Sequence, residues 1–216
     1  KGRKMRVVIL AGGKGSRLSE YTKKIPKPMV KIKDKPILIH IMKHYAKYGY
    51  KDFIIATGYK HNLIKNFFKK QYLDWKIKVV NTGINSMTGG RVRKLKKILN
   101  GNKFFLTYGD GVSNVNLKKL LDFHNSSNTL ATLTAVRPPA RFGVIKIKGK
   151  KVLVFREKST LDTGWINGGF FVFEPEIFKY LKSDQTILEQ EPLTKLGKKN
   201  NLSAFKHFGY WYCMDT

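Results

Sequence analysis

Short runs of consecutive apolar residues alternate with amphipathic segments through the first half of the chain. Apolar runs of this length, several of them ended by glycine, are typical of strands buried on both faces. Strands are therefore expected at residues 7–10, 53–56, 76–80 and 104–106. Between them, apolar residues recur with helical spacing around residues 37–48, 63–68 and 92–99. This alternation predicts an α/β fold with a mainly parallel sheet flanked by helices.

The pattern changes after about residue 128, where the apolar segments become shorter. Strand candidates lie at residues 129–136, 144–147, 152–155 and 169–173, and helical spacing returns at 175–181 and 189–196. The glycine and two lysines at 149–151 predict a hairpin turn. Since no repeat or low-complexity linker divides the chain, we expect one domain over residues 1–216, with a smaller mixed β region in its second half.

Composition narrows the class of protein further. The chain has 216 residues, of which 42% are hydrophobic, so it can bury a core without disulfides or metals. The single cysteine, Cys213, excludes a disulfide framework and a cysteine-rich zinc site. No apolar run approaches the roughly 20 residues that cross a bilayer, and no secretory segment opens the sequence. We therefore expect a soluble protein of the cytoplasm.

The charge is strongly positive, with 43 Lys and Arg against 14 Asp and Glu, a formal net charge of +29. Such a charge suits polyanionic partners, so a nucleic-acid-binding domain is one alternative. The lysines are scattered as doublets along the whole chain, whereas a dedicated nucleic-acid arm is usually one block of like charges. The pattern favours small phosphorylated substrates over nucleic acid, and it leaves the formation of a homo-oligomer open.

A glycine loop follows the first expected strand, in the segment Leu10-Ala-Gly-Gly-Lys-Gly-Ser-Arg-Leu18. Glycines let the backbone approach a ligand closely, and successive N–H groups in such a loop form an anion-binding concavity. The spacing differs from that of a P-loop, and Leu18 stands where the dinucleotide fingerprint needs its last glycine. Many glycine loops only reverse the chain. Arg17, within the loop, favours a phosphate-binding role.

A lysine between two prolines comes next, in Ile25-Pro26-Lys27-Pro28-Met29. The prolines stiffen the backbone and bias Lys27 away from helix. A rigidly held ammonium could meet charge that develops on a phosphoryl group. The alternative is a surface turn that carries one of many lysines.

An aspartate between two glycines, Asp110, follows the strand expected at 104–106. Ligands of open α/β sheets bind at the carboxyl edge, where this residue would lie. A carboxylate is the oxygen ligand that Mg²⁺ prefers. The alternative is a turn aspartate that caps the next helix. Asp215 could supply a second carboxylate, whereas Arg91 and Arg93 are expected on the solvated face of a helix, from which either could reach a triphosphate.

These motifs occur in the order found in the sugar-phosphate nucleotidyltransferase family, and the chain resembles its cytidylyltransferase branch most. The resemblance also covers Lys35-Pro-Ile-Leu38, Tyr108-Gly-Asp-Gly111, Asn81-Thr-Gly-Ile-Asn-Ser-Met-Thr-Gly-Gly-Arg91, Arg141-Phe-Gly143, Glu157-Lys158, Ile166-Asn-Gly-Gly-Phe170, Glu189-Gln-Glu-Pro192 and Met214-Asp-Thr216. It implies a Rossmann-like fold of the nucleotide-diphospho-sugar transferase type. Residues up to about 128 would bind nucleotide, and about 129–216 would bind the sugar phosphate.

The implied reaction joins CTP and glucose 1-phosphate to give CDP-glucose and pyrophosphate, by in-line attack assisted by Mg²⁺. The protein would mainly position the phosphates and neutralise their charge. The implied site residues are Arg17 and Lys27 for catalysis; Leu10, Ala11, Gly12, Gly13, Lys14, Gly15, Ser16, Arg17, Lys27, Asn85, Gly90 and Gly109 for the nucleotide; Gly143, Glu157, Lys158, Asn167 and Gly168 for the sugar phosphate; and Asp110 and Asp215 for Mg²⁺. Alternatively, Gly143 and Gly168 are strand bends, and Glu157 and Lys158 form an exposed ion pair.

The chain departs from the family pattern in three places. The segment between residues 60 and 81 is shorter than in the family's cytidylyltransferases, and Ile25 stands where the family usually has a lysine. The sequence also stops at Thr216, directly after the Met-Asp-Thr motif, which predicts a C-terminally truncated chain. These departures leave alternatives open. One is a related nucleotidyltransferase that uses UTP, dTTP or another sugar phosphate, and another is a non-catalytic binding domain on the same fold.

Overall fold

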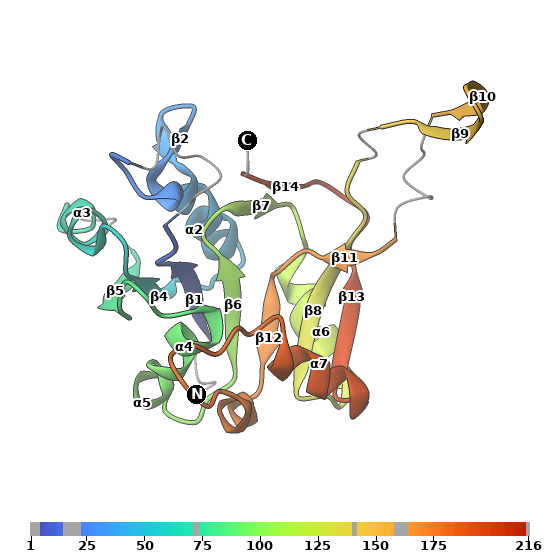
Figure 1. The fold of residues 1–216 in the computed structure, drawn as a ribbon. Helices are drawn as coiled ribbons and strands as arrows, with labels where there is room; N and C mark the ends of the chain where they lie inside the picture. Colours follow the sequence, from blue (N-terminus) through green and yellow to red (C-terminus); the bar gives the residue numbers. More distant parts are fainter. Residues whose placement is uncertain (1–4, 15–22, 71–73, 140–141, 158–163, 215–216) are drawn as a thin grey trace.

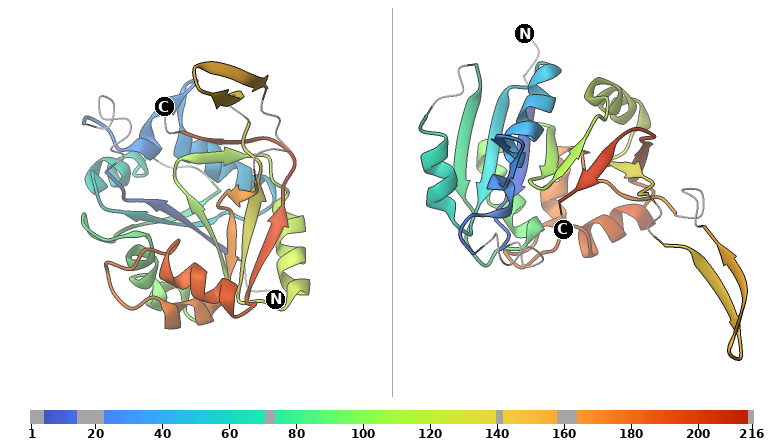
Figure 2. Two further views of the ribbon diagram at one scale, coloured as in Figure 1. Left: turned by 45° about the vertical axis from the view of Figure 1, so that its right-hand side comes forward. Right: turned by 90° about the horizontal axis from the view of Figure 1, so that it is seen from above.

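The computed structural model describes residues 5–14, 23–70, 74–139, 142–157 and 164–214. Its centre is an eight-stranded sheet in the order β11-β8-β12-β6-β1-β4-β5, with β13 paired to β8 (Figure 1). Helices lie on both faces of this sheet (Figure 2). The expected α/β fold with a mainly parallel sheet and helices on both faces is confirmed.

The first half of the chain forms the parallel part of the sheet. The strand β1 (Arg6–Ala11) lies between β4 (Asp52–Thr57) and β6 (Phe104–Tyr108), and β5 (Lys76–Asn81) continues beyond β4. All four strands run parallel, and each contains one of the apolar runs that predicted it. Parallel strands end at the same edge, so the glycine segments after β1 and β6 lie next to each other.

The second half adds the mixed part of the same sheet. The strand β12 (Phe171–Phe173) pairs antiparallel with both β6 and β8 (Ala131–Val136). Short β11 (Ile166–Asn167) pairs antiparallel with β8, whereas β13 (Leu202–Lys206) pairs parallel with it. Strands from both halves of the chain therefore belong to one sheet.

Two hydrophobic clusters cover the two faces of the sheet. Alternate residues of β1 point to opposite faces, so Val7 and Ile9 belong to one cluster and Val8 and Leu10 to the other. The first cluster packs against α2 (Ile37–Lys47), α3 (His61–Phe67) and α6 (Leu117–Ser127). The second packs against α4 (Thr88–Arg93), α5 (Lys96–Leu99), η3 (Pro175–Tyr180) and α7 (Glu191–Lys198).

Three two-stranded sheets accompany the central one. β2 (Lys31–Ile32) pairs with β3 (Lys35–Pro36), and β7 (Gly111–Ser113) pairs with β14 (Trp211–Cys213). The third is the hairpin of β9 (Val144–Lys148) and β10 (Lys151–Arg156), whose turn contains Gly149 at φ 60°. This hairpin, expected from the sequence, projects away from the rest of the molecule (Figures 1 and 2). We call it the arm.

Some elements differ from the sequence predictions. The helix expected at 92–99 is divided into α4 and α5, and the segment at 175–181 forms the 3-10 helix η3. No helix among the described residues is long and apolar enough to cross a membrane.

Candidate active site

A pocket of about 310 Å³ opens at the carboxyl ends of β1 and β6. It combines the glycine loop after β1, a short 3-10 turn η2 (Lys27–Met29), the start of α4 and the turn after β6. Its lining residues are Leu10, Ala11, Gly12, Gly13, Lys27, Pro28, Ser86, Met87, Thr88, Arg91, Tyr108, Gly109 and Asp110. Three motifs that the sequence singled out separately therefore meet in one place.

The glycine at position 109 allows the two strand ends to approach each other. Its N–H donates to the Leu10 carbonyl at 2.9 Å. A Cβ at this position would lie 2.7 Å from the same oxygen and 3.0 Å from Cγ of Pro28. Only glycine therefore fits between β1 and the turn that carries Lys27.

An ion pair lies in the pocket between Lys27 and Asp110. The Lys27 Nζ is 2.8 Å from Oδ2 of Asp110, and the two side chains are 14% and 26% exposed. The lysine is held by a backbone in which Met29 N–H donates to the Pro26 carbonyl at 2.9 Å. Because the pair is only partly screened by water, its geometry is better fixed than that of an exposed salt bridge.

The last described residues of the chain hold the Asp110 turn from the other side. β14 pairs with β7 so that Cys213 lies opposite Gly111, and Met214 N–H donates to the Asp110 carbonyl at 2.8 Å. The thiol of Cys213 lies 3.7 Å from Oδ2 of Asp110. Residues about a hundred positions apart in the sequence therefore fix this carboxylate together.

Arg91 is buried beneath the pocket, and its hydrogen-bond partners among the described residues are all neutral oxygens. Nη1 donates to the Gly83 carbonyl at 2.6 Å, to Thr82 Oγ1 at 3.0 Å and to the Thr57 carbonyl at 3.2 Å. Nη2 donates to the Gly12 carbonyl at 3.0 Å. The side chain thus joins the glycine loop to the ends of β4 and β5. The expectation of a solvated face is wrong for Arg91 and is confirmed for Arg93, which is exposed.

Two glycines make room for this guanidinium. A Cβ on Gly12 would lie 2.3 Å from Nη1 of Arg91, and one on Gly58 would lie 2.5 Å from the same atom. Burial lowers the pKa of Arg91 from its ordinary value. The group still remains a cation, because arginine does not lose its proton in proteins, so a positive charge lies directly under the pocket.

Tyr108 borders the pocket on the side of the second half of the chain. Burial raises the pKa of its hydroxyl, and the negative charge of Glu189 raises it further. Asn167 Nδ2 donates to the Tyr108 hydroxyl at 3.2 Å, and Trp211 Nε1 donates to the Gly168 carbonyl at 2.9 Å. Two of the expected sugar-phosphate residues, Asn167 and Gly168, therefore lie beside the pocket.

Other expected site residues do not line the pocket. Asn85 is exposed, and its carbonyl accepts from Gln185. A Cβ on Gly90 would lie 2.0 Å from the Asp184 carbonyl, so Gly90 faces the second half of the chain. Gly143 directly precedes the first strand of the arm and Glu157 directly follows the second strand, and both residues are exposed. Lys14, also exposed, follows the part of the loop that lines the pocket.

Several candidates cannot be placed. Gly15, Ser16, Arg17, Lys158 and Asp215 lie outside the described residues. Among the residues that the structure describes, no group of three His, Cys, Asp or Glu is arranged to hold a metal ion. Asp110 is the expected metal ligand that the pocket contains.

Sequence reasoning gave no role to several pocket residues, among them Ser86, Met87, Thr88 and Tyr108. A signal for three of them was present, since residues 86–88 belong to the segment that ends in Gly-Gly-Arg. That segment was interpreted through Asn85 and Gly90 alone. Thr88 also connects the two halves of the chain, because its hydroxyl donates to Glu189 Oε2 at 2.8 Å.

Comparisons with known proteins agree with this geometry. Residues 6–212 match the family model described as nucleotidyl transferase. A glucose-1-phosphate cytidylyltransferase of Salmonella typhimurium is 44% identical, over 98% of this chain and 91% of its own length. A D-glycero-alpha-D-manno-heptose 1-phosphate guanylyltransferase of Campylobacter jejuni is 33% identical, over 90% and 87%. A solved structure of a putative glucose-1-phosphate thymidylyltransferase from Bacillus anthracis shares the fold, with a TM-score of 0.76 at 18% identity over 98% and 90% of the chains.

Proposed function

The chain belongs to the nucleotidyl transferase family, and on that premise we propose that it transfers a cytidylyl group from CTP to glucose 1-phosphate. The products would be CDP-glucose and pyrophosphate. The observation that carries the reaction type is the pocket in which the glycine loop, Lys27 and Asp110 meet. The choice of CTP and glucose 1-phosphate is supported by the 44% identity to a glucose-1-phosphate cytidylyltransferase.

In the proposed reaction, an oxygen of the sugar phosphate attacks the α-phosphorus of CTP in line. A new P–O bond forms as the bond from the α-phosphorus to the leaving pyrophosphate oxygen breaks. No covalent link to the protein is needed, so the protein accelerates the step by positioning both substrates and by offsetting negative charge. The N–H groups of the glycine loop and the cations around the pocket suit that task.

We assign the main electrostatic roles to Lys27 and Arg17. The Lys27 ammonium lies in the pocket at the level of the strand ends, where the phosphates of a bound nucleotide would lie. Its ion pair with Asp110 holds it there before substrate arrives. Arg17 is assigned by the family resemblance alone. Leu10, Ala11, Gly12, Gly13 and Gly109 would contact the nucleotide through the backbone.

The Asp110 carboxylate suits a magnesium ion. It is a hard oxygen donor in a pocket that also contains a lysine and neighbouring backbone amides, which is the setting of a metal-bound phosphate. A bound Mg²⁺ would offset charge on the reacting phosphate. Asp110 would orient the ion from the protein side, and we assign Asp215 as the second ligand from the resemblance.

The second half of the chain would bind the sugar phosphate. Asn167 and Gly168 support this assignment, because Asn167 donates to Tyr108 at the border of the pocket. Gly143, Glu157 and Lys158 are assigned from the resemblance. For the base, we keep Asn85 and Gly90 as the expected reading positions and add Ser86 and Thr88, which line the pocket and could contact a ring there.

The test is a turnover panel in which pyrophosphate release is measured with each of the four NTPs and with several sugar 1-phosphates. We expect CTP with glucose 1-phosphate to give the highest kcat/KM. The second candidate is a nucleotidyltransferase that uses another base or another sugar. The observation that favours it is the 33% identity to a guanylyltransferase that acts on a heptose 1-phosphate. A preference for GTP with a heptose or mannose 1-phosphate would favour it. No release with any pair would reject both.

Asp110→Ala and Lys27→Met test the two central assignments. Each should lower kcat/KM about a hundredfold or more, because each removes a charge that acts on the reacting phosphates. The matched control is Lys97→Met, an exposed lysine on α5, which should leave turnover unchanged. Far-UV circular dichroism checks that all three variants fold. Wild-type turnover in Asp110→Ala over a range of Mg²⁺ concentrations would contradict the metal assignment.

A further inference from the structure

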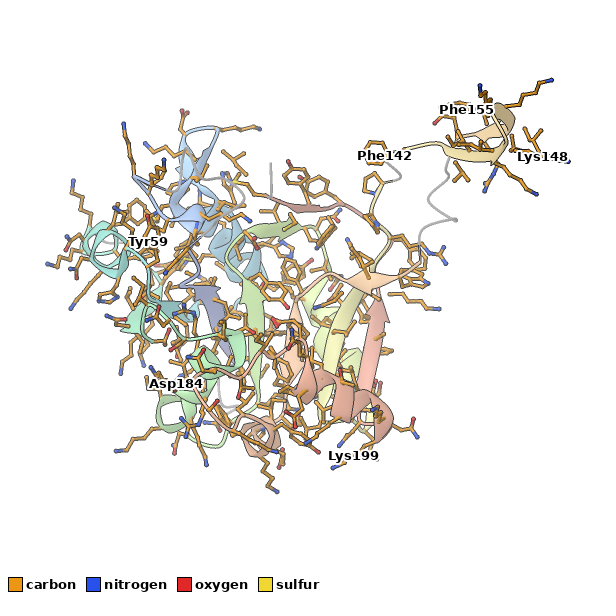
Figure 3. All side chains as sticks on the ribbon, in the orientation of Figure 1. Tyr59, Phe142, Lys148, Phe155, Asp184 and Lys199 are labelled. Carbon is orange, nitrogen blue, oxygen red and sulfur yellow. The ribbon has the colours of Figure 1, made fainter. Side chains whose placement is uncertain are left out.

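Two segments rich in lysine meet at the amino edge of the sheet, opposite the candidate active site. β12 runs antiparallel to β6, so η3, which follows β12, lies at the edge where β6 begins. β13 starts beside the first residue of β8 at the same edge, and α7 leads into it. Figure 3 shows Lys199, the residue after α7, at the end of the molecule away from the arm. The pocket with Lys27 and Asp110 lies at the carboxyl edge, so the two regions are separate.

A hollow of about 470 Å³ lies between these two segments. It is lined by Tyr180, Glu191 and five lysines, which are Lys179, Lys182, Lys195, Lys198 and Lys199. Its volume falls within the roughly 300–1,000 Å³ of small-molecule sites. Five ammonium groups and one carboxylate therefore surround a space that a small molecule can fill. We call this space the lysine hollow.

The single carboxylate offsets little of the positive charge. Glu191 Oε1 lies 2.6 Å from Nζ of Lys195 and 3.7 Å from Nζ of Lys182. The hydrogen bond from Lys195 lowers the pKa of Glu191, so this carboxylate is ionised and already engaged. No carboxylate of the described residues forms an ion pair with the other three lysines of the hollow. Their charges remain uncompensated by the chain.

The backbone keeps the lysines of α7 at the hollow. Residues three and four apart on a helix are neighbours on its surface, and Lys195, Lys198 and Lys199 have this spacing. Leu193 and Leu196, on the side of α7 away from these lysines, are buried in the second hydrophobic cluster. The helix therefore cannot turn its lysines away without exposing leucines, and the like charges repel one another until an anion enters.

The chemistry of the lysine hollow favours a ligand with several negative charges close together. Lysine binds phosphate oxygens as a point charge on a flexible stem. One phosphate would leave most of the ammonium groups unpaired, whereas adjacent phosphates can contact several at once. Lys199 Nζ also lies 5.4 Å from the centre of the Tyr180 ring, which joins the α7 side of the hollow to the η3 side. A duplex nucleic acid is too wide to enter a space of this volume.

We propose that the lysine hollow is a second anion-binding site, for small molecules with two or more adjacent phosphate groups. The phosphate oxygens pair with the three lysines that lack a carboxylate and compete with Glu191 for the other two. Binding offsets the repulsion and stabilises the folded chain. Since the site lies at the opposite edge from the pocket, the proposal does not rest on the proposed function, and its test does not use turnover.

The test combines thermal unfolding and isothermal titration calorimetry of the full chain with inorganic tripolyphosphate, at constant ionic strength and without Mg²⁺. At about a hundredfold excess over the dissociation constant, the melting temperature should rise by about 5 °C or more. Inorganic phosphate should bind at least about tenfold more weakly, because it carries one phosphate group.

The variant Lys198→Gln/Lys199→Gln should raise the dissociation constant for tripolyphosphate about tenfold or more. Without tripolyphosphate it should melt at or above the wild-type temperature, because it removes repulsion. The matched control Lys96→Gln/Lys97→Gln removes two exposed charges on α5 and should keep the wild-type dissociation constant. Lys27→Met should also retain the binding, which distinguishes the lysine hollow from the candidate active site.

Four results would each overturn the proposal. These are an unchanged dissociation constant in Lys198→Gln/Lys199→Gln, an equal loss of affinity in the α5 control, loss of binding in Lys27→Met, and equally tight binding of inorganic phosphate. Tighter binding of duplex DNA or of anionic lipid vesicles, lost in the same α7 variant, would also overturn it, because a large polyanion would then be the partner.

Discussion

Arg91 connects the sequence pattern around the pocket to its shape. The guanidinium donates to carbonyls of Gly12, Thr57 and Gly83, which lie at the carboxyl ends of three different strands, β1, β4 and β5. None of these acceptors is charged, so the positive charge of Arg91 remains available to attract an anion in the pocket. One side chain therefore fixes the backbone of the pocket and contributes to its electrostatic potential.

Replacing Arg91 with Met should damage both stability and nucleotide binding. The variant leaves buried carbonyls without their donor, which should cost about 2–4 kcal/mol of the free energy of unfolding. The loss of the cation should also raise KM for the nucleotide. Arg91→Lys keeps the charge but has fewer N–H donors. Its free energy of unfolding and its KM for the nucleotide should therefore lie between those of wild type and of Arg91→Met. Urea unfolding and initial-rate kinetics measure these effects.

The control for this prediction is Arg93→Met on the same helix. Arg93 pairs with Asp184 at 3.5 Å, and both side chains are nearly half exposed, so its loss should change the free energy of unfolding by less than about 1 kcal/mol. Equal effects of the two substitutions would show that burial and the neutral partners of Arg91 do not matter.

For single residues, the sequence predicts which side chains have a chemical role better than it predicts how deeply each side chain is buried. Lys27 and Asp110 were identified because their flanking prolines and glycines set them apart, and both line the pocket. The burial of Arg91 could not be predicted from the residues next to it in the sequence. It depends on the space left by Gly12 and Gly58, which are distant in sequence and meet only in the folded chain.

Helix α4 is the element that brings the two halves of the chain together at the pocket. Its two glycines let it approach the segment that follows η3, where Met87 N–H donates to the Asp184 carbonyl at 2.9 Å and Gly90 N–H donates to the Thr186 carbonyl at 3.1 Å. Close backbone contact of this kind requires the absence of a side chain. The Gly-Gly pair is therefore a packing feature as well as part of a family motif.

Gly90→Ala should destabilise the protein although alanine favours helices. The added Cβ would lie 2.0 Å from the backbone oxygen of Asp184, so α4 or its neighbour must shift, at a cost of about 1–3 kcal/mol. The control is Gly197→Ala in α7, where a Cβ meets nothing within 4 Å. It should be neutral or stabilise by about 0.5–1 kcal/mol. Thermal unfolding of both variants decides whether close packing or helix propensity dominates at Gly90.

The strength of the apolar pattern decided which elements could be predicted. β1, β4 and β6 are continuous apolar runs and were expected within one or two residues of their observed ends. β13 and β14 were missed because they are short and only partly buried, so their positions depend on pairing with β8 and β7. α6 was also missed, although Asn116 gives a local signal by accepting from Lys119 N–H at 3.0 Å.

For the molecule as a whole, the large positive charge lies mainly on the surface, whereas His124 is buried within it and His44 is half-buried. His124 lies between Thr132 Oγ1 at 2.7 Å and Glu174 Oε2 at 2.6 Å, and His44 donates to the Val115 carbonyl at 2.9 Å. Burial is the main cause that lowers the pKa of each from 6.5. Both histidines are therefore harder to protonate in the folded chain than in the unfolded one.

Stability should consequently fall as the pH is lowered through about 6.5. The unfolded chain takes up protons there that the folded chain resists, so the stabilisation is present above that pH and is lost below it. Thermal unfolding between about pH 7.5 and 5.5 measures the effect, in a range where lysines and most carboxylates do not titrate. His124→Gln should reduce the slope. A wild-type melting temperature independent of pH over this range would contradict the prediction.

The fit of Arg91 against Gly12 and Gly58 affects how mutagenesis of this region must be interpreted. A substitution at either glycine would normally be attributed to the nucleotide loop or to the end of β4. Here the first atoms that a new methyl group meets belong to Arg91, except that the Gly83 carbonyl is equally close to position 58. Low activity in such a variant would therefore result from displacement of Arg91. Only double variants that also shorten Arg91 can distinguish this displacement from a direct effect on the nucleotide loop or on the end of β4.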